Sequence, residues 1–259
     1  MTLADARGIV LDLDGCVWNG AEATPGAREL IAALRRAGRG VAFLSNNSRA
    51  TGRDIHARLE ALGIEADPNR VLTPLEIVGE FIRERHGVSR VLVIGADEMA
   101  TAIRAAGHEL VPIDRYRDAT VVAVGNDFDL SYARLTAAAR AVAAGAALVT
   151  PNVDARLPIE GGDFLPGSGA IVEAVAIAGG RRPEIVGKPE PPLFRIALAR
   201  LGLRAAEVVM VGDSVDSDIR GARRVGMRTV LYSPDGGPAS AEADLTVRSF
   251  AELGAALGV

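Results

Sequence analysis

The sequence predicts an α/β protein whose parallel-sheet core is interrupted by a second α/β segment. Short runs rich in Val, Ile and Leu alternate along the 259 residues with segments whose apolar positions recur at helical spacing. Polar residues of the kind that carry chemistry gather around positions 12, 45, 188 and 213, near both ends of the chain. The middle shows the same alternation but has few such residues. We therefore expect a core formed by residues 1–79 and 183–259, with an inserted domain at 80–182.

Strands are predicted where short runs are mostly apolar and often β-branched, which is the pattern of parallel strands buried on both faces. Because helical segments separate these runs, the strands are expected to pair in parallel. The runs lie at residues 8–13, 41–45, 70–73, 90–94, 120–124, 147–150, 184–186, 208–211 and 228–232.

Helices are predicted from apolar stripes together with the residues that begin and end them. Thr24 is expected to cap the first helix, with Pro25 at its first position and Gly38 just past its end. Thr51 and Asp54 have the spacing of a capping box at the start of the second. Further helices are expected at residues 75–86, 131–144, 191–201 and 219–225.

Composition argues against several classes of function. The formal net charge is −4 and no basic cluster stands out, so nucleic acid is a poor partner. The apolar runs are far too short to span a membrane, and a carboxylate pair inside the first run argues against a signal peptide. The single cysteine, Cys16, fits a reducing cytosol and is expected to be a packed thiol. We therefore expect a cytoplasmic protein without a membrane partner.

Two carboxylates, Asp12 and Asp14, follow the apolar run at residues 8–11. Residues two apart in a strand point to one face, so both carboxylates are expected at the carboxyl end of a buried strand, where open α/β sheets bind ligands. Two like charges side by side repel, and a divalent cation, a shared proton or a nearby lysine must compensate. The alternative is a solvated turn at Gly15.

The predicted strand at 208–211 ends in a similar way, because Asp213 follows it closely and Asp216 and Asp218 come next. Magnesium takes oxygen ligands, usually few carboxylates together with water and phosphate oxygens. Asp213 and Asp12 would fit such a site. An alternative that is compatible with it is that Ser217 or Asp216 caps the helix that follows.

Two further segments suit an anionic ligand. Ser45, Asn46 and Asn47 end the predicted strand at 41–45, and their hydroxyl and backbone N–H groups can cradle an anion, although such residues also cluster at ordinary turns. Lys188 is the only lysine among 29 basic residues. It lies just past a short strand and just before a helix, without the glycine spacing of a P-loop. A compact ammonium charge there suits an active site.

In this order, the segments D-x-D-G, S-N-N, G-K-P and G-D-S-x-x-x-D resemble the signature of the haloacid dehalogenase (HAD) phosphatase superfamily. They lie at residues 12–15, 45–47, 187–189 and 212–218. The S-N-N form and the place of the insert are similar to the class IIA, NagD-like branch, which includes phosphoglycolate and 4-nitrophenyl phosphatases. The resemblance covers essentially the whole chain. It implies a doubly wound, Rossmann-like parallel-sheet core with an inserted α/β cap domain of the C2 type.

The resemblance also implies catalytic roles. Asp12 is the nucleophile that forms a phospho-aspartate, and Asp14 is the acid for the leaving group and then the base for water. Ser45 and the backbone of Asn46 hold the phosphoryl group. Lys188 neutralises charge on Asp12 and on the phosphate.

For the metal, the resemblance implies that Asp213, Asp12 and the backbone carbonyl of Asp14 bind Mg²⁺, and that Asp218 binds it through water. In the middle of the chain, residues 150–154 are similar to the cap-to-core segment of the branch. Asn152 and Asp154 are therefore expected to contact the substrate, although Pro and Asn stand here in the reverse of the order that many members have.

We therefore expect a Mg²⁺-dependent phosphomonoester hydrolase that acts on a small phosphorylated metabolite, and the family implies a homodimer. One alternative is a phosphomutase with the same phospho-aspartate. Another is a phospho-acceptor or binding module of the response-regulator type, which would not explain the large insert or Asp14. The sequence does not choose among phosphoglycolate, glycerol phosphate, sugar phosphates, nucleoside monophosphates and pyridoxal phosphate.

Overall fold

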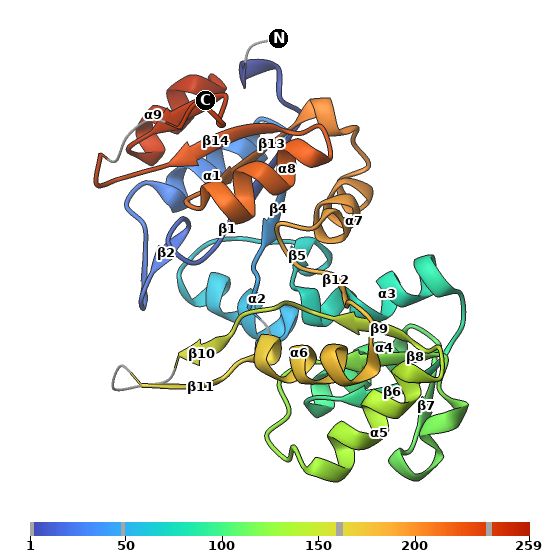
Figure 1. Ribbon diagram of the computed structural model, residues 1–259. Coiled ribbons are helices and arrows are strands. Elements are labelled where there is room, and N and C mark those ends of the chain that lie inside the picture. The colour runs from blue at the N-terminus through green and yellow to red at the C-terminus, as the bar shows by residue number, and fades with distance from the viewer. Residues whose placement is uncertain (1–2, 48–49, 159–162, 237–239) are drawn as a thin grey trace. The chain divides into compact units, whose positions relative to one another are not determined.

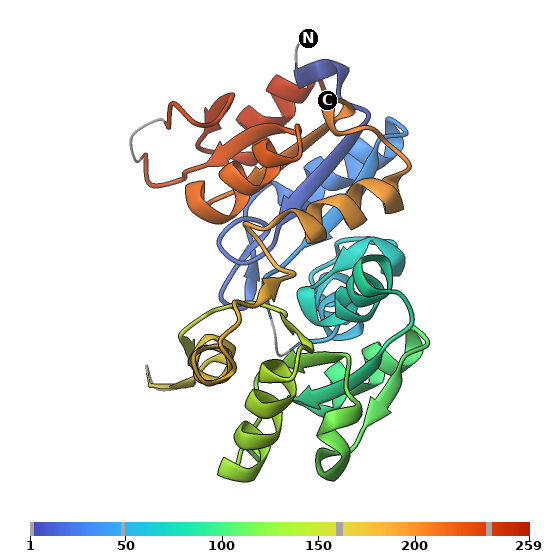
Figure 2. The same cartoon turned by 45° about the vertical axis from the view of Figure 1, so that its right-hand side comes forward.

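The computed structural model describes residues 3–47, 50–158, 163–236 and 240–259 (Figure 1). Within it the chain forms two compact units. Unit 1 consists of Met1–Ser45, Gly52–Thr73 and Lys188–Val259, and unit 2 of Asn46–Thr51 and Pro74–Gly187. The longer segment of unit 2, Pro74–Gly187, extends a few residues beyond both ends of the predicted insert at 80–182. Each unit has its own parallel sheet, with helices on both faces (Figures 1 and 2), so the predicted α/β class is confirmed.

The sheet of unit 1 has the strand order β15-β14-β13-β1-β4-β5, and every neighbouring pair runs parallel. The inner strand β1 is buried along its whole length, which its apolar sequence allows. The strands are β1 (Gly8–Asp12), β4 (Gly40–Leu44), β5 (Val71–Leu72), β13 (Val208–Gly212), β14 (Arg228–Tyr232) and β15 (Leu245–Val247). A short antiparallel pair, β2 (Trp18–Asn19) and β3 (Glu22–Ala23), follows β1.

Helices cover this sheet in two groups: α1 packs against α9, and α7 packs against α8. The chain leaves β1 toward β4 and leaves β13 in the opposite direction toward β14, so right-handed crossovers place α1 and α8 on opposite faces. The helices are α1 (Ala27–Arg36), α2 (Gly52–Ala61), α7 (Pro191–Leu201), α8 (Arg220–Arg224) and α9 (Phe250–Leu257). A π-helical turn at Val215–Ile219 leads directly into α8.

The strand order reverses between β1 and β13, two parallel neighbours in which Leu11 pairs with Val211. Open α/β sheets bind their ligands in the crevice beyond the carboxyl ends of the strands at such a point. Asp12 ends β1, and Asp213 follows β13 directly. The topology therefore brings together two acidic residues that lie far apart in the sequence.

Unit 2 has a second parallel sheet, in the order β12-β9-β8-β6-β7. Its helices also pack in pairs, α3 with α4 and α5 with α6. The strands are β6 (Arg90–Ile94), β7 (Glu109–Val111), β8 (Val121–Val124), β9 (Ala147–Thr150) and β12 (Glu184–Ile185). The helices are α3 (Pro74–His86), α4 (Asp97–Ala105), α5 (Tyr132–Ala143) and α6 (Ser168–Gly179). An antiparallel pair, β10 (Arg156–Pro158) and β11 (Phe164–Pro166), precedes α6.

Two predicted helix caps are wrong. Gly26, not Thr24, is the N-cap of α1, with a φ of 82° that favours glycine. The Thr24 hydroxyl instead donates to the backbone carbonyl of Cys16 at 2.6 Å. Before α8, the side chain of Ser214 caps the turn, and those of Ser217 and Asp216 do not. The Ser214 hydroxyl accepts a hydrogen bond from the backbone N–H of Ser217. In both cases another residue of the same loop has the geometry that capping requires.

Among the described residues, no helix combines the length and the apolar character that crossing a bilayer requires. The longest of the described α-helices, α3, has 13 residues, and its last turn contains Arg83, Arg85 and His86.

Close packing of α3 on α4 yields a stability prediction. A Cβ at Gly79 would lie 2.7 Å from the Cβ of Ala106 and 2.8 Å from the backbone oxygen of Ala102. Because backbone cannot move aside cheaply, we expect Gly79→Ala to destabilise the protein by about 2 kcal/mol despite the better helix propensity of alanine. Urea unfolding followed by circular dichroism measures this. The control Glu84→Ala, at an exposed position of the same helix, should change stability by less than about 0.5 kcal/mol, and equal effects of the two would contradict the packing.

Candidate active site

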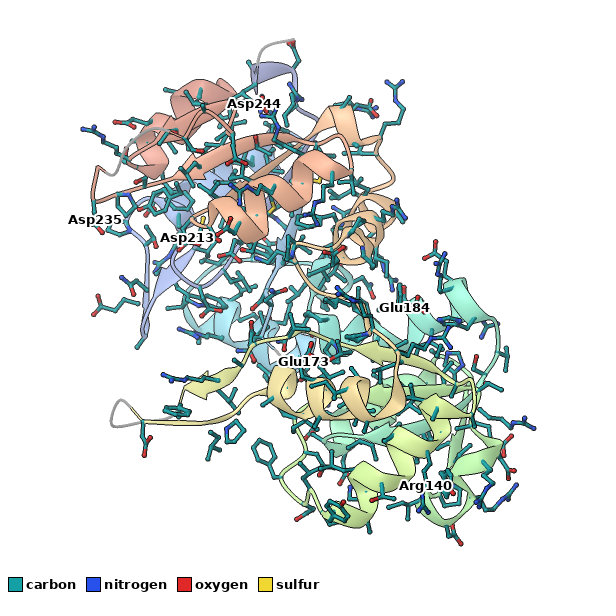
Figure 3. All side chains as sticks on the ribbon, viewed as in Figure 1. Arg140, Glu173, Glu184, Asp213, Asp235 and Asp244 are labelled. Atoms are coloured by element: carbon teal, nitrogen blue, oxygen red, sulfur yellow. The ribbon has the colours of Figure 1, made fainter. Side chains whose placement is uncertain are left out.

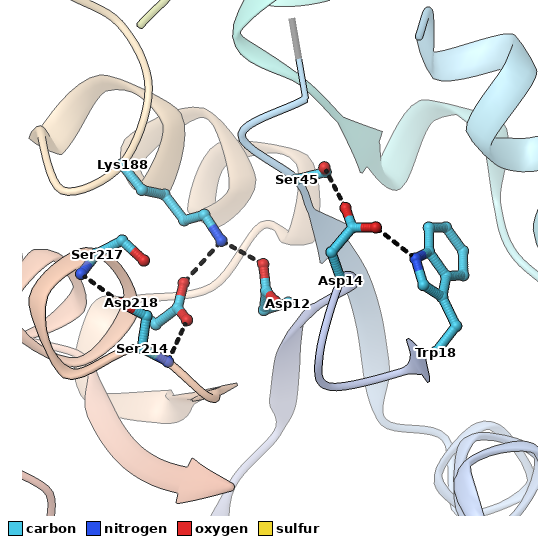
Figure 4. A network of polar contacts seen from close by, with 8 residues as sticks. All are labelled: Asp12, Asp14, Trp18, Ser45, Lys188, Ser214, Ser217 and Asp218. Carbon is cyan, nitrogen blue, oxygen red and sulfur yellow. Dashed lines mark hydrogen bonds and ion pairs between the residues drawn. The ribbon is translucent and has the colours of Figure 1, made fainter. Parts of the chain in front are cut away.

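Lys188 is the centre of a buried charge network in unit 1 (Figure 4). Its Nζ donates to Oδ1 of Asp12 and, at 2.7 Å, to Oδ1 of Asp218. The exposed fractions of the three side chains are only 3%, 8% and 1%, respectively. Burial of a charge is costly unless it is paired, so each of these groups depends on the others. The structure thus places the only lysine of the chain beside the predicted nucleophile.

Local structure fixes the two carboxylates of this network. Asp12 is the last residue of β1, and Asp218 lies in the π-helical turn after β13. The backbone N–H of Ser214 donates to Oδ2 of Asp218 at 3.1 Å. A Cβ at Gly212 would lie 2.3 Å from the same Oδ2. Glycine at the end of β13 therefore leaves the space that the Asp218 carboxylate occupies.

The network perturbs the protonation of its members. Burial raises the pKa of Asp12 to about 7; Lys188 opposes this shift, and the neighbouring Asp218 and Asp213 add to it. Burial alone would lower the pKa of Lys188, but the charges of Asp218 and Asp12 outweigh it, so the pKa is raised and the ammonium is retained. The pKa of Asp213 is raised as well, first by partial burial of its carboxyl and then by the charge of Asp218, although this residue reaches solvent.

The acidic residues fit a divalent cation. Asp12, Asp213 and Asp218 each offer an oxygen, and these oxygens lie within 4.8 Å of one another. Three carboxylates face one lysine, which leaves excess negative charge that a cation would balance, and hard cations prefer such oxygen ligands. A Cβ at Gly15 would lie 2.3 Å from Oδ2 of Asp213, so glycine keeps this space clear. Figure 3 shows Asp213 on the ribbon of unit 1.

Asp14 makes different contacts from Asp12. Its Oδ1 accepts a hydrogen bond of 2.8 Å from the indole N–H of Trp18, and its Oδ2 lies 3.4 Å from Oγ of Ser45 (Figure 4). Ser45 is buried, and its backbone N–H donates to the carbonyl of Leu72. The structure therefore joins the first two predicted segments at one carboxylate. Trp18 was not among the residues predicted for the site, although a buried indole N–H usually needs an acceptor.

Cys16 lies in the turn between β1 and β2 and is fully buried. Burial and the neighbouring charge of Asp12 raise the pKa of its thiol well above the ordinary value. A thiol that stays protonated is a poor nucleophile, so this position agrees with the predicted packed thiol.

Comparison with known proteins places this site in a family. A family model of haloacid dehalogenase-like hydrolases matches residues 9–109, and a HAD-hydrolase-like model matches residues 185–253. An acid sugar phosphatase of Staphylococcus haemolyticus is 33% identical over 224 residues, which is 86% of this chain and 84% of that protein. The chain belongs to the haloacid dehalogenase-like hydrolases.

Solved structures agree with membership of the HAD superfamily. A p-nitrophenyl phosphatase from Archaeoglobus fulgidus has a TM-score of 0.85 at 29% identity, over 98% of this chain and 100% of that one. A hypothetical protein from Pyrococcus horikoshii has a TM-score of 0.84 at 32% identity, over 95% and 97% of the two chains. The predicted HAD phosphatase of the NagD-like, class IIA type is therefore confirmed as to family and enzyme class.

Other residues predicted for the HAD site lie in unit 2. Asn46 belongs to this unit, and its backbone carbonyl accepts a hydrogen bond of 3.0 Å from Nδ2 of Asn152. Oδ1 of Asn152 accepts from the hydroxyl of Ser168 and from the backbone N–H of Asp154. Asn152 thus ties together three segments of unit 2. Asp154 is exposed as a whole residue. Neighbouring atoms nevertheless cover part of its carboxyl, and this partial burial raises its pKa.

The glycines at the start of α6 have a packing role in this HAD chain. A Cβ at Gly167 would lie 2.2 Å from the carbonyl oxygen of Asp154, and one at Gly169 would lie 2.2 Å from that of Val153. The N–H of Gly169 donates to the Asp154 carbonyl at 3.0 Å. Close approach of two backbones therefore accounts for both glycines.

The buried carboxyl of Asp12 predicts an unusual pH dependence of stability without metal. Its pKa of about 7 in the folded protein exceeds the ordinary 3.8, so the folded state keeps a proton that the unfolded state releases. The free energy of unfolding of the metal-free protein, compared with that of Asp12→Asn, should therefore fall by up to about 4 kcal/mol as the pH rises from about 4 to about 7.

Urea unfolding in the presence of a chelator tests this dependence. The fluorescence of Trp18, the only tryptophan of the chain, reports on unit 1. A stability difference between wild type and Asp12→Asn that is constant across this pH range would contradict the prediction.

Proposed function

We propose that the protein is a Mg²⁺-dependent phosphomonoester hydrolase that acts on a small phosphorylated metabolite through a phospho-aspartate on Asp12. The observation that carries this proposal is the contact of Lys188 with Asp12 beside Asp213 and Asp218, at the point between β1 and β13 where the strand order reverses. A carboxylate there can attack phosphorus only if its repulsion from the anionic ester is reduced. Mg²⁺, when bound by these carboxylates, would supply positive charge for that purpose.

In the first step the Asp12 carboxylate attacks phosphorus and the bond to the ester oxygen breaks. Asp14 gives its proton to the leaving oxygen, and Lys188 balances charge on Asp12 and the phosphoryl group. In the second step Asp14 takes a proton from water, the water oxygen attacks phosphorus, and the bond between phosphorus and the Asp12 oxygen breaks. Inorganic phosphate leaves and Asp12 is regenerated. Ser45, with the Asn46 backbone, holds the phosphoryl oxygens.

In the proposed metal site, Asp213 and Asp12 would hold Mg²⁺ together with the backbone carbonyl of Asp14. Asp218 acts through water and through its hydrogen bond to Lys188. The carboxylates of the cluster support Asp12 and Asp213 as ligands. The parts of the Asp14 carbonyl and of water beside Asp218 are what the family resemblance implies.

The relatives support small phosphomonoesters as substrates. One is named an acid sugar phosphatase and another a p-nitrophenyl phosphatase. We therefore place sugar phosphates first among the candidates, and we propose that the insert predicted at 80–182 is a C2-type cap that selects the substrate. Asn152 and Asp154 remain our candidates for contacts with it. Hydrolysis is favoured over a phosphomutase reaction because these relatives are named phosphatases.

Cytoplasmic location and a homodimer are also part of this proposal. The single buried cysteine is consistent with a reducing compartment. Light scattering on the purified protein measures the oligomeric state directly, and a monomer at micromolar concentration would contradict the homodimer.

Phosphate release from 4-nitrophenyl phosphate tests the proposed chemistry. We expect turnover that depends on Mg²⁺ and stops in a chelator, and we expect Asp12→Asn to lower kcat by at least about 1,000-fold because the nucleophile is lost. Asp213→Asn should raise the Mg²⁺ concentration needed for half-maximal rate. The control Glu84→Gln, at an exposed position of unit 2, should behave as wild type. Turnover that persists in Asp12→Asn would contradict the mechanism.

A further inference from the structure

Trp18 is the only tryptophan of the chain, and it is almost fully buried, with 2% of its surface exposed. Its indole N–H donates to Oδ1 of Asp14 at 2.8 Å, a normal hydrogen-bond length (Figure 4). Asp14 itself is exposed, so its carboxylate would otherwise turn freely about its side-chain bonds. The indole thus fixes one oxygen of a carboxylate that solvent would leave mobile.

The loop between β1 and β3 holds the indole in this place. The backbone N–H of Trp18 donates to the carbonyl of Leu13 at 3.1 Å, and the backbone N–H of Gly15 donates to the carbonyl of Trp18 at 2.9 Å. The chain thereby turns back after Asp14 and returns the tryptophan to it. Gly15, with a φ of 84°, makes this turn possible.

Arg58 of α2 covers the face of the same ring. Its Cζ lies 4.1 Å from the ring centroid of Trp18, which is the geometry of a cation–π contact. The guanidinium also donates to the backbone carbonyl of Gly20, beyond the short strand β2. Trp18 is therefore held from two sides, through its own backbone and through Arg58.

We propose that Trp18 is a positioning residue for Asp14, an inference that rests on the acid and base role proposed for Asp14. An indole N–H can only donate a hydrogen bond, and it does not titrate in the working pH range. Oδ1 of Asp14 must accept that bond whether the carboxyl is protonated or ionised. The indole thus occupies Oδ1 and leaves Oδ2 as the oxygen that faces the site; Oδ2 lies 3.4 Å from Oγ of Ser45, where the phosphoryl group is proposed to bind.

The same hydrogen bond serves both steps of the reaction. In the first step Oδ2 carries the proton for the leaving oxygen, and in the second step the same atom receives a proton from water. Rotation of the carboxyl between the two steps is unnecessary, because the indole holds Oδ1 throughout. Such positioning keeps Oδ2 close to the atom with which it exchanges a proton. A displacement of even about 1 Å at that point can slow a reaction greatly.

Trp18→Phe isolates the hydrogen bond, since it keeps an aromatic ring under Arg58 and removes the N–H. We compare phenyl phosphate with 4-nitrophenyl phosphate, because phenolate, with a pKa of about 10 like that of tyrosine, needs a proton in order to leave, whereas 4-nitrophenolate scarcely does. We expect kcat/KM for phenyl phosphate to fall by about 10- to 100-fold. The fall for 4-nitrophenyl phosphate should be several-fold smaller, and KM should change little for both.

Two further variants separate positioning from folding. Arg58→Met removes the cation above the ring. It should lower kcat/KM for phenyl phosphate more than for 4-nitrophenyl phosphate, but by less than Trp18→Phe does. Arg53→Met, at an exposed position of the same helix, should leave both substrates unaffected. A purely structural role of Trp18 would lower activity on both substrates equally, with a lower midpoint of thermal unfolding, and that result would overturn the inference.

Tryptophan fluorescence provides a readout that does not depend on activity. All tryptophan emission comes from Trp18, so Asp14→Ala should shift the emission maximum by removing the acceptor of its N–H. The control Glu84→Ala should not. An unchanged emission in Asp14→Ala would mean that the hydrogen bond does not form in solution, and the inference would fail.

Asp14→Asn distinguishes this inference from the proposed function. If Asp14→Asn keeps wild-type turnover, the role proposed for Asp14 is wrong and the positioning inference falls with it. If Asp14→Asn loses turnover while Trp18→Phe behaves as wild type on both substrates, only the positioning inference falls. In the double variant we expect no loss beyond that of Asp14→Asn, because Trp18 acts through Asp14.

Discussion

The ammonium of Lys188 between Asp12 and Asp218 is the contact on which the rest of the site depends. All three groups are buried, and none could stay charged there without the others. Burial, with the charges of Asp218 and Asp213 adding to it, raises the pKa of Asp12 although Lys188 opposes the shift. Because one lysine faces three clustered carboxylates, the site also retains negative charge that suits a divalent cation. The same imbalance explains why an anionic phosphate ester would need that cation in order to approach Asp12.

The two sides of the site have different physical designs. Asp12 is held by buried charge, whereas Asp14 is exposed and is held by a neutral indole N–H from Trp18. A nucleophile benefits from a fixed place beside a lysine. A group that must both give and take a proton benefits from a partner that does not titrate. Gly15 and Gly212 leave space for two further carboxylates of the site, because a Cβ at Gly15 would collide with Asp213 and one at Gly212 with Asp218.

Much of this could be predicted from local sequence patterns. The strands that end near Asp12 and Asp213, and the place of Lys188 between a strand and a helix, follow from short apolar runs and helix punctuation. The short strands β7 and β15 were missed because runs of three residues have no period to detect. Trp18 was missed because its contact with Asp14 depends on how a loop returns, and the direct bond of Asp218 to Lys188 depends on a π-helical turn. Neither feature has a signature in the sequence.

The most direct test of the central claim is to locate the phosphoryl group during turnover. The protein is quenched in acid while it hydrolyses 4-nitrophenyl phosphate with Mg²⁺, and its peptides are mapped by mass spectrometry. The account predicts one phosphoryl group on the peptide that contains Asp12, sensitive to hydroxylamine as an acyl phosphate should be, and absent from Asp12→Asn. A phosphoryl group on another residue, or rapid turnover during which no phosphoryl group is trapped on Asp12, would contradict it.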